Sequence, residues 1–135
     1  MPFIRTCVHH ESSAAQRAAI VEGIHQALVQ AIGMPTDELF NRVTVYRSDE
    51  FFFSKTFNGY ARSDRPVVIE ITMRRGRSDA MKRELYRLIA HNLQQQAQIH
   101  PNDVFIFVHE NDYSDRSVGG GRFAMAIAQQ TGPSA

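Results

Sequence analysis

The residues with the clearest potential for chemistry stand at the start of the chain, which reads Met1-Pro2-Phe3-Ile4-Arg5. Methionine aminopeptidase removes Met1 when a proline follows, so Pro2 can become the N-terminal residue. A prolyl N-terminus is a secondary amine on a rigid ring, and an α-amino group titrates near pH ~8. Burial or nearby cations would lower that pKa and favour a general base, whereas a high pKa would favour a general acid. Pro2 is therefore the first candidate catalytic residue, in either role.

The segment Arg74-Arg75-Gly76-Arg77-Ser78 is a candidate anion site. It lies where a predicted strand ends and a predicted helix begins, and α/β units bind ligands at the carboxyl ends of their strands. A helix N-terminus adds unpaired N–H groups that favour anions. Arg75 and Arg77 would point the same way along an extended segment and hold one carboxylate in the forked geometry that lysine lacks. The alternative interpretation is a solvated basic turn.

Two adjacent acids, Asp37 and Glu38, lie between the first predicted helix and the second predicted strand. A carboxylate at this place would orient a water molecule or a substrate hydroxyl, or hold a cationic amine. The alternative is a pair of acids in a polar loop. Cys7 is predicted to lie in the core, and the histidines do not have the spacing of a zinc site. The sequence therefore predicts neither a metal nor a cofactor.

Composition narrows the class of protein. The chain has 135 residues, is 43% hydrophobic and carries a formal net charge of +1, with basic and acidic residues interspersed. This balance gives no reason to expect a nucleic acid or a membrane surface as the partner. The chain shows neither a long apolar run nor a signal-like segment, and its one cysteine suits a reducing compartment. We therefore expect a soluble cytoplasmic protein.

Hydrophobic periodicity predicts an α+β fold in a single domain over residues 1–135. Strands are expected over 3–8, 42–47, 67–73 and 104–109, a helix from Ser12 or Ser13 to Gly33, and a second helix from Ser78 through Leu93. These elements form tandem β-α-β halves, at about 2–47 and 66–110, and a right-handed crossover makes the two strands of each half parallel. We expect a four-stranded sheet with two helices on one face. The uncovered face would be apolar and mark a subunit interface.

Three other segments have simpler expectations. Phe51-Phe52-Phe53 is a short strand or a packed turn, and Gly119-Gly120-Gly121 is a tight turn that leads into a short strand over 122–126. The polar tail over 129–135 is expected to be disordered.

The order of several short motifs resembles a known family. They follow the Met-Pro start and are Gly33-Met34-Pro35, Gly59-Tyr60-Ala61-Arg62-Ser63, Arg75-Gly76-Arg77-Ser78, Pro101-x-Asp103-Val104, Glu110-Asn111 and Ser117-Val118-Gly119. With the tandem β-α-β pattern, they resemble the tautomerase superfamily over residues 2 to 123. The greater likeness is to its malonate semialdehyde decarboxylase-like branch, which shares the β-α-β fold of 4-oxalocrotonate tautomerase.

This resemblance implies roles for particular residues. Pro2 would be the catalytic amine after the loss of Met1, and Arg75 and Arg77 would bind the substrate carboxylate. The family's catalytic aspartate corresponds to Glu38 in an ungapped match, or to Asp37 if one residue is skipped, and we prefer Glu38. The resemblance also implies a homotrimer in which the open sheet faces meet as a barrel.

The chain departs from the family pattern in the wall of the pocket. Arg116 replaces a tryptophan that is often present, and Val118 replaces a usual phenylalanine. The leading hypothesis is an enzyme that uses Pro2 for keto–enol tautomerisation of a small 2-oxo or enol carboxylic acid. A cationic Pro2 would instead suit a decarboxylase or a hydratase. A hypothesis from another class is a non-enzymatic trimeric binding protein that keeps the scaffold.

Overall fold

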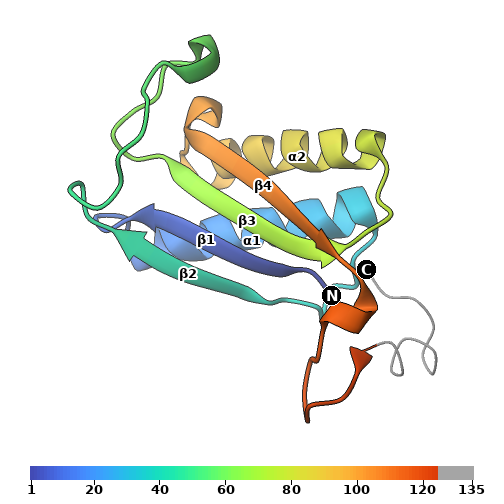
Figure 1. Cartoon of the computed structure of the whole chain (residues 1–135). Coiled ribbons are helices and arrows are strands. Elements are labelled where there is room, and N and C mark those ends of the chain that lie inside the picture. The colour runs from blue at the N-terminus through green and yellow to red at the C-terminus, as the bar shows by residue number, and fades with distance from the viewer. Residues whose placement is uncertain (125–135) are drawn as a thin grey trace.

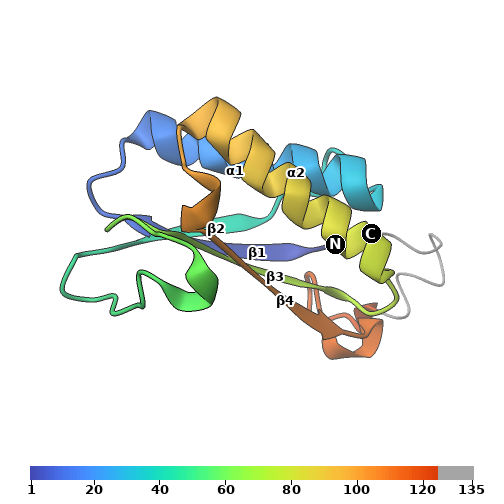
Figure 2. The same cartoon turned by 90° about the horizontal axis from the view of Figure 1, so that it is seen from above.

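The computed structural model describes residues 1–124. Two strand–helix–strand units follow each other along the chain. Their elements are β1 (Phe3–His9), α1 (Ala14–Ile32), β2 (Asn41–Tyr46), β3 (Val67–Arg74), α2 (Asp79–Ala97) and β4 (Val104–Asn111), with short 3-10 turns η1 (Phe57–Gly59), η2 (Pro101–Asp103) and η3 (Tyr113–Asp115). Both helices lie on the same face of the sheet (Figures 1 and 2). The predicted fold class is confirmed, and each strand begins or ends within two residues of its predicted bounds.

The strand order places the start of the chain beside the end of β3. The sheet order is β2-β1-β3-β4, with β1 parallel to β2, β3 parallel to β4, and β1 antiparallel to β3. Phe3 therefore lies opposite Thr72, two residues before the end of β3. This register brings the N-terminus next to the Arg74–Ser78 segment and to the chain that leaves β4 (Figure 1).

Local signals at the helix ends explain where the helices begin and end. The Ser13 hydroxyl accepts a hydrogen bond from the N–H of Gln16 at the start of α1, and Ser78 does the same for Met81 in α2. Gly33 ends α1 with φ +70°, a left-handed conformation that glycine adopts without a steric cost. The chain therefore turns sharply after α1, and this turn delivers the Asp37-Glu38 loop to the same end of the sheet as the N-terminus.

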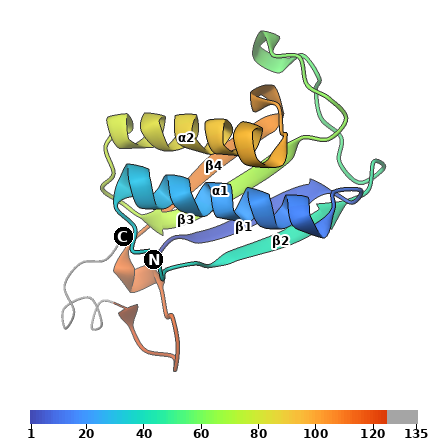
Figure 3. The ribbon, with the colours of Figure 1, turned by 180° about the vertical axis from the view of Figure 1, so that it is seen from behind.

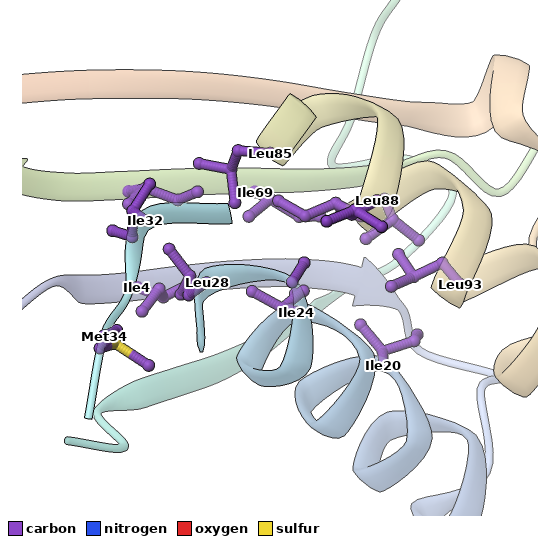
Figure 4. Close-up of a cluster of buried hydrophobic side chains, with 14 of the residues drawn as sticks. Ile4, Ile20, Ile24, Leu28, Ile32, Met34, Ile69, Leu85, Leu88 and Leu93 are labelled. Carbon is purple, nitrogen blue, oxygen red and sulfur yellow. The ribbon is translucent and has the colours of Figure 1, made fainter. Parts of the chain in front are cut away.

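Figure 3 shows the two helices in front of one face of the sheet, and the buried side chains of the core lie between these layers (Figure 4). Alternate residues of β3 are buried, and one stripe of each helix packs against them. The largest fully buried side chains include Ile4, Ile20, Ile24, Leu28, Ile69, Ile71, Leu85, Ile89 and Leu93. Burial of this many branched side chains makes the start of β1 a rigid support for Met1 and Pro2, which precede it.

The uncovered face of the sheet is less apolar than predicted. Phe107 is exposed on this face, but the centre of the face is charged. The Glu70 carboxylate accepts a hydrogen bond from Arg5 at 3.1 Å and lies 3.1 Å from the Nε2 atom of His109. The face therefore combines aromatic side chains with a charged cluster. Arg5 lies directly opposite Glu70 across β1 and β3, and His109 lies diagonal to Glu70 on β4, two residues beyond Phe107, which is the partner of Glu70 in the register.

Two connecting segments had open or simple expectations. Of the two alternatives for Phe51-Phe52-Phe53, the strand does not form, and the segment is an irregular connection whose Phe51 ring packs 5.0 Å from the Tyr46 ring. The strand predicted over 122–126 does not form over 122–124, because the three preceding glycines turn the chain and the N–H of Ala124 bonds back to the carbonyl of Arg116. The remainder of that predicted strand and the tail over 129–135 lie outside the described residues.

Candidate active site

The N-terminal amine lies in a partly enclosed site at the end of the sheet. Pro2 is buried, and Met1 lines an open pocket of about 250 Å³ together with Thr72, Asn111 and Arg116. The Met1 amine lies 3.6 Å from the Oε2 atom of Glu38. Because β1 holds Phe3 and Ile4 in the sheet, the N-terminus is fixed by the fold rather than being a free tail.

Of the two candidate acids, the structure brings Glu38 to the amine. The Glu38 N–H bonds to the carbonyl of Pro35, which tightens the turn after α1, and its carboxylate is 19% exposed. Asp37 is exposed, and no contact between it and the amine is found among the described residues. Glu38 Oε2 is buried and has no hydrogen-bond partner among residues 1–124, so its contact there is the 3.6 Å ion pair with the Met1 amine.

The two predicted arginines lie in different surroundings. Arg77 is 7% exposed, and its charge acts on the N-terminal amine. Its Nη1 atom donates to the Arg74 carbonyl at 3.0 Å. The Arg75 side chain is 62% exposed and contacts Asp112 at 3.4 Å. Gly76 separates them with φ +119°, so the segment is not extended there and the two side chains do not share one direction.

Arg116 is a site residue that the sequence indicated only as a replaced tryptophan. Its Nη1 atom donates to the Met1 carbonyl at 2.9 Å, and its Nε atom donates to the Oδ1 atom of Asn111 at 2.9 Å. Both Arg116 and Arg74 also lie near the Tyr113 ring, at 5.9 and 5.8 Å from its centroid. No local pattern predicts this approach, because Arg116 follows β4 in an irregular segment 115 residues after the N-terminus.

Burial and charge shift the pKa of the N-terminal amine in opposite directions. The pKa lies below its ordinary value, and the largest cause is burial, which disfavours the charged form. The Glu38 carboxylate raises the pKa, whereas the charges of Arg116 and Arg77 lower it. Burial and the two arginines therefore shift the Met1 amine toward its neutral form, which is the form that a general base requires.

Other kinds of site have no support in residues 1–124. There the structure places no group of three or more His, Cys, Asp or Glu side chains that could hold a metal ion. Within the same residues, neither helix is long and apolar enough to cross a bilayer. Cys7, predicted to be a core residue, is only partly buried and lies on the uncovered face beside Arg5 and Arg42.

Solved structures with this architecture define the class of protein. The structure of FG41 malonate semialdehyde decarboxylase inhibited by 3-bromopropiolate superposes with a TM-score of 0.89 at 27% identity, covering 97% of this chain and 99% of that chain. A fused 4-OT wild-type symmetric trimer matches with a TM-score of 0.77, covering 93% of this chain and 98% of that chain; at 17% identity it shows the fold alone.

Sequence relatives identify the family. The family model described as tautomerase enzyme matches residues 38–119. "Probable tautomerase YusQ" of Bacillus subtilis (strain 168) is 30% identical over 125 residues, which cover 93% of this chain and 98% of that protein. The chain belongs to the tautomerase superfamily, in its malonate semialdehyde decarboxylase-like branch, and is an enzyme of the tautomerase kind.

Proposed function

We propose that this enzyme moves a proton on a small 2-oxo or enol carboxylic acid with the amine of Pro2, which the removal of Met1 sets free. The observation that carries the proposal is the N-terminal amine itself, which lies partly buried between Glu38 and the two arginines Arg77 and Arg116. Removal of Met1 would place the amine one residue further along the chain, on the buried ring of Pro2, where we expect the same groups to act on it.

The proposed reaction is a 1,3-keto–enol tautomerisation. Arg77, with Arg75 as the second predicted contact, binds the substrate carboxylate and stabilises negative charge on the enolate oxygen. The neutral Pro2 nitrogen takes the proton of the enol hydroxyl, the O–H electron pair becomes the carbonyl bond, and the carbon–carbon double-bond pair takes a proton from the Pro2 ammonium. Protons and electrons balance, and the amine is regenerated as a neutral base.

A second reaction has a specific observation in its favour. Glu38 raises the pKa of the amine, and a cationic Pro2 would polarise a 3-oxo group and support decarboxylation or hydration. The similarity to a malonate semialdehyde decarboxylase agrees with this alternative. We favour the tautomerase because burial, which lowers the pKa, has the largest effect on the amine.

An assay of both reactions on Met1-free protein tests this choice. We expect the enol form of a small 2-oxo acid, such as phenylpyruvate, to be ketonised faster than in buffer, as followed by the loss of its ultraviolet absorbance. Release of CO₂ from malonate semialdehyde without any enol turnover would favour the decarboxylase instead. Membership of a family of enzymes already sets aside the binding-protein hypothesis.

We further propose that three copies assemble through their uncovered sheet faces. This face carries exposed Phe107, the charged cluster of Arg5, Glu70 and His109, and an apolar pocket of about 350 Å³ between the Phe51–Phe57 segment and β4. The symmetric trimer of similar fold supports this arrangement. Sedimentation equilibrium should give about three times the 15.3 kDa chain mass at micromolar concentration. A monomer mass would contradict the trimer.

A further inference from the structure

The guanidinium of Arg116 is held in a fixed orientation next to the N-terminus. Its Nε atom donates to Asn111, the last residue of β4, and its plane lies near the Tyr113 ring. Its Nη1 atom donates to the Met1 carbonyl at 2.9 Å. Since β4 carries the Asn111 support, the arginine side chain is preorganised and would lose little conformational freedom on binding a ligand.

One donor of this arginine has no hydrogen-bond partner in the part of the chain that the structure describes. The Nη2 atom of Arg116 is buried, and among residues 1–124 no group accepts a hydrogen bond from it. A buried and unpaired charged donor costs free energy, and folded proteins rarely keep one without a reason. Glu38 Oε2 also has no hydrogen bond among these residues, but it lies 3.6 Å from the Met1 amine and forms an ion pair with it. The Nη2 donor of Arg116 is therefore the group that remains available to a ligand at this site.

Removal of Met1 would free the second donor. The Met1 carbonyl carbon is bonded directly to the Pro2 nitrogen, so its loss leaves Nη1 without an acceptor immediately beside the new amine. The Nη1 and Nη2 atoms form a two-pronged edge, which matches the two oxygens of a carboxylate. The Met1 carbonyl thus occupies, in the unprocessed chain, the place of a carboxylate oxygen.

We propose that Arg116 is a substrate-binding residue, whose Nη1–Nη2 edge holds an acidic group of the substrate beside Pro2. The Pro2 role is taken from the proposed function, but the anion site follows from the contacts of Arg116 itself. Arg116 stands where the family pattern often has an apolar tryptophan, so this wall of the pocket is cationic. The preferred substrates therefore carry a carboxylate at the end that faces Arg116. Retained Met1 would block this anion site as well as the amine.

Binding of malonate to Met1-free protein, measured by isothermal titration calorimetry, tests the proposal. Hydrogen bonds to charged groups contribute about 1.5–3 kcal/mol, so Arg116→Gln should weaken binding by roughly 10- to 100-fold. Arg116→Lys should recover part of the affinity, since it keeps the charge without the fork. The matched control is Arg87→Gln, an exposed arginine of α2 that pairs with Glu84, and its affinity should equal that of the wild type.

Two further measurements separate a binding role from a structural one. Protein made with methionine aminopeptidase inhibited, and confirmed by intact mass to retain Met1, should bind malonate at least tenfold more weakly than processed protein. Equal affinity in the retained and processed forms, or wild-type affinity in Arg116→Gln, would overturn the proposal. Pro2→Ala should keep malonate binding while losing turnover; wild-type turnover in that variant would refute the role of Pro2 and leave the anion site standing.

Discussion

Pro2→Ala should lower kcat/KM for enol ketonisation by roughly 10²- to 10⁴-fold, the range that a general base contributes. Alanine still allows Met1 to be removed, so the variant keeps an N-terminal amine. That amine is primary and sits on a freely rotating residue, whereas the proline nitrogen is fixed by its ring and by the β1 strand that follows it. Enol absorbance assays and intact mass of both proteins measure the effect.

The comparison needs a folded and fully processed variant. The circular dichroism spectrum and the melting temperature of the variant should match those of the wild type. Pro2 lies before β1 and donates none of the hydrogen bonds that join β1 to its neighbouring strands. Turnover within threefold of the wild type, in protein shown by mass to lack Met1, would rule out Pro2 as the catalytic amine.

Arg77→Gln should raise KM for a carboxylate substrate by about 10- to 100-fold and lower kcat less. The reason is that Arg77 is nearly buried and its charge acts on the N-terminal amine, so it is placed to bind the anionic group and to lower the amine pKa. Loss of a hydrogen bond to a charged group costs about 1.5–3 kcal/mol. Steady-state kinetics on the enol substrate provide the measurement.

Controls separate binding from folding for this arginine. Arg77 also donates to the Arg74 carbonyl, so the melting temperature of the variant must be measured alongside its kinetics. Arg77→Lys keeps the charge without the fork and should fall between the wild type and the glutamine variant. The KM of Arg75→Gln, measured in the same way, tests the second predicted arginine, whose side chain contacts Asp112. A wild-type KM for Arg77→Gln would contradict the carboxylate-binding role.

The fold was predictable because its signals are local. Ser13 and Ser78 cap the two helices, and Gly33 ends the first helix. Apolar residues recur at helical spacing in each helix and alternate with polar residues in β3, as their burial in the structure shows. Two similar strand–helix–strand units then permit few arrangements of the sheet, since crossover connections are right-handed. The charged centre of the uncovered face escaped prediction because Arg5 and Glu70 are far apart in the sequence and meet only through the register of β1 and β3.

The candidate site was predictable only in part. Pro2 follows from the chain start. The loop after the glycine-terminated helix offers both Asp37 and Glu38, and only the family resemblance favours Glu38. The directions of Arg75 and Arg77 depend on the backbone conformation of Gly76, which spacing alone does not determine. Arg116 reaches the N-terminus through an irregular segment after β4, so its role became visible only from its contacts with Met1 and Asn111.

The pKa of the Pro2 nitrogen, measured by NMR titration of isotope-labelled and mass-verified protein, tests the central claim most directly. We expect a value below the ~8 of an ordinary α-amino group, because burial and the two arginines outweigh Glu38. Glu38→Gln should lower it further, since this change removes the charge that raises it. A nitrogen that does not titrate would mean that Met1 is retained and no amine exists. A pKa above ~8 would contradict the neutral base and point to a cationic acid instead.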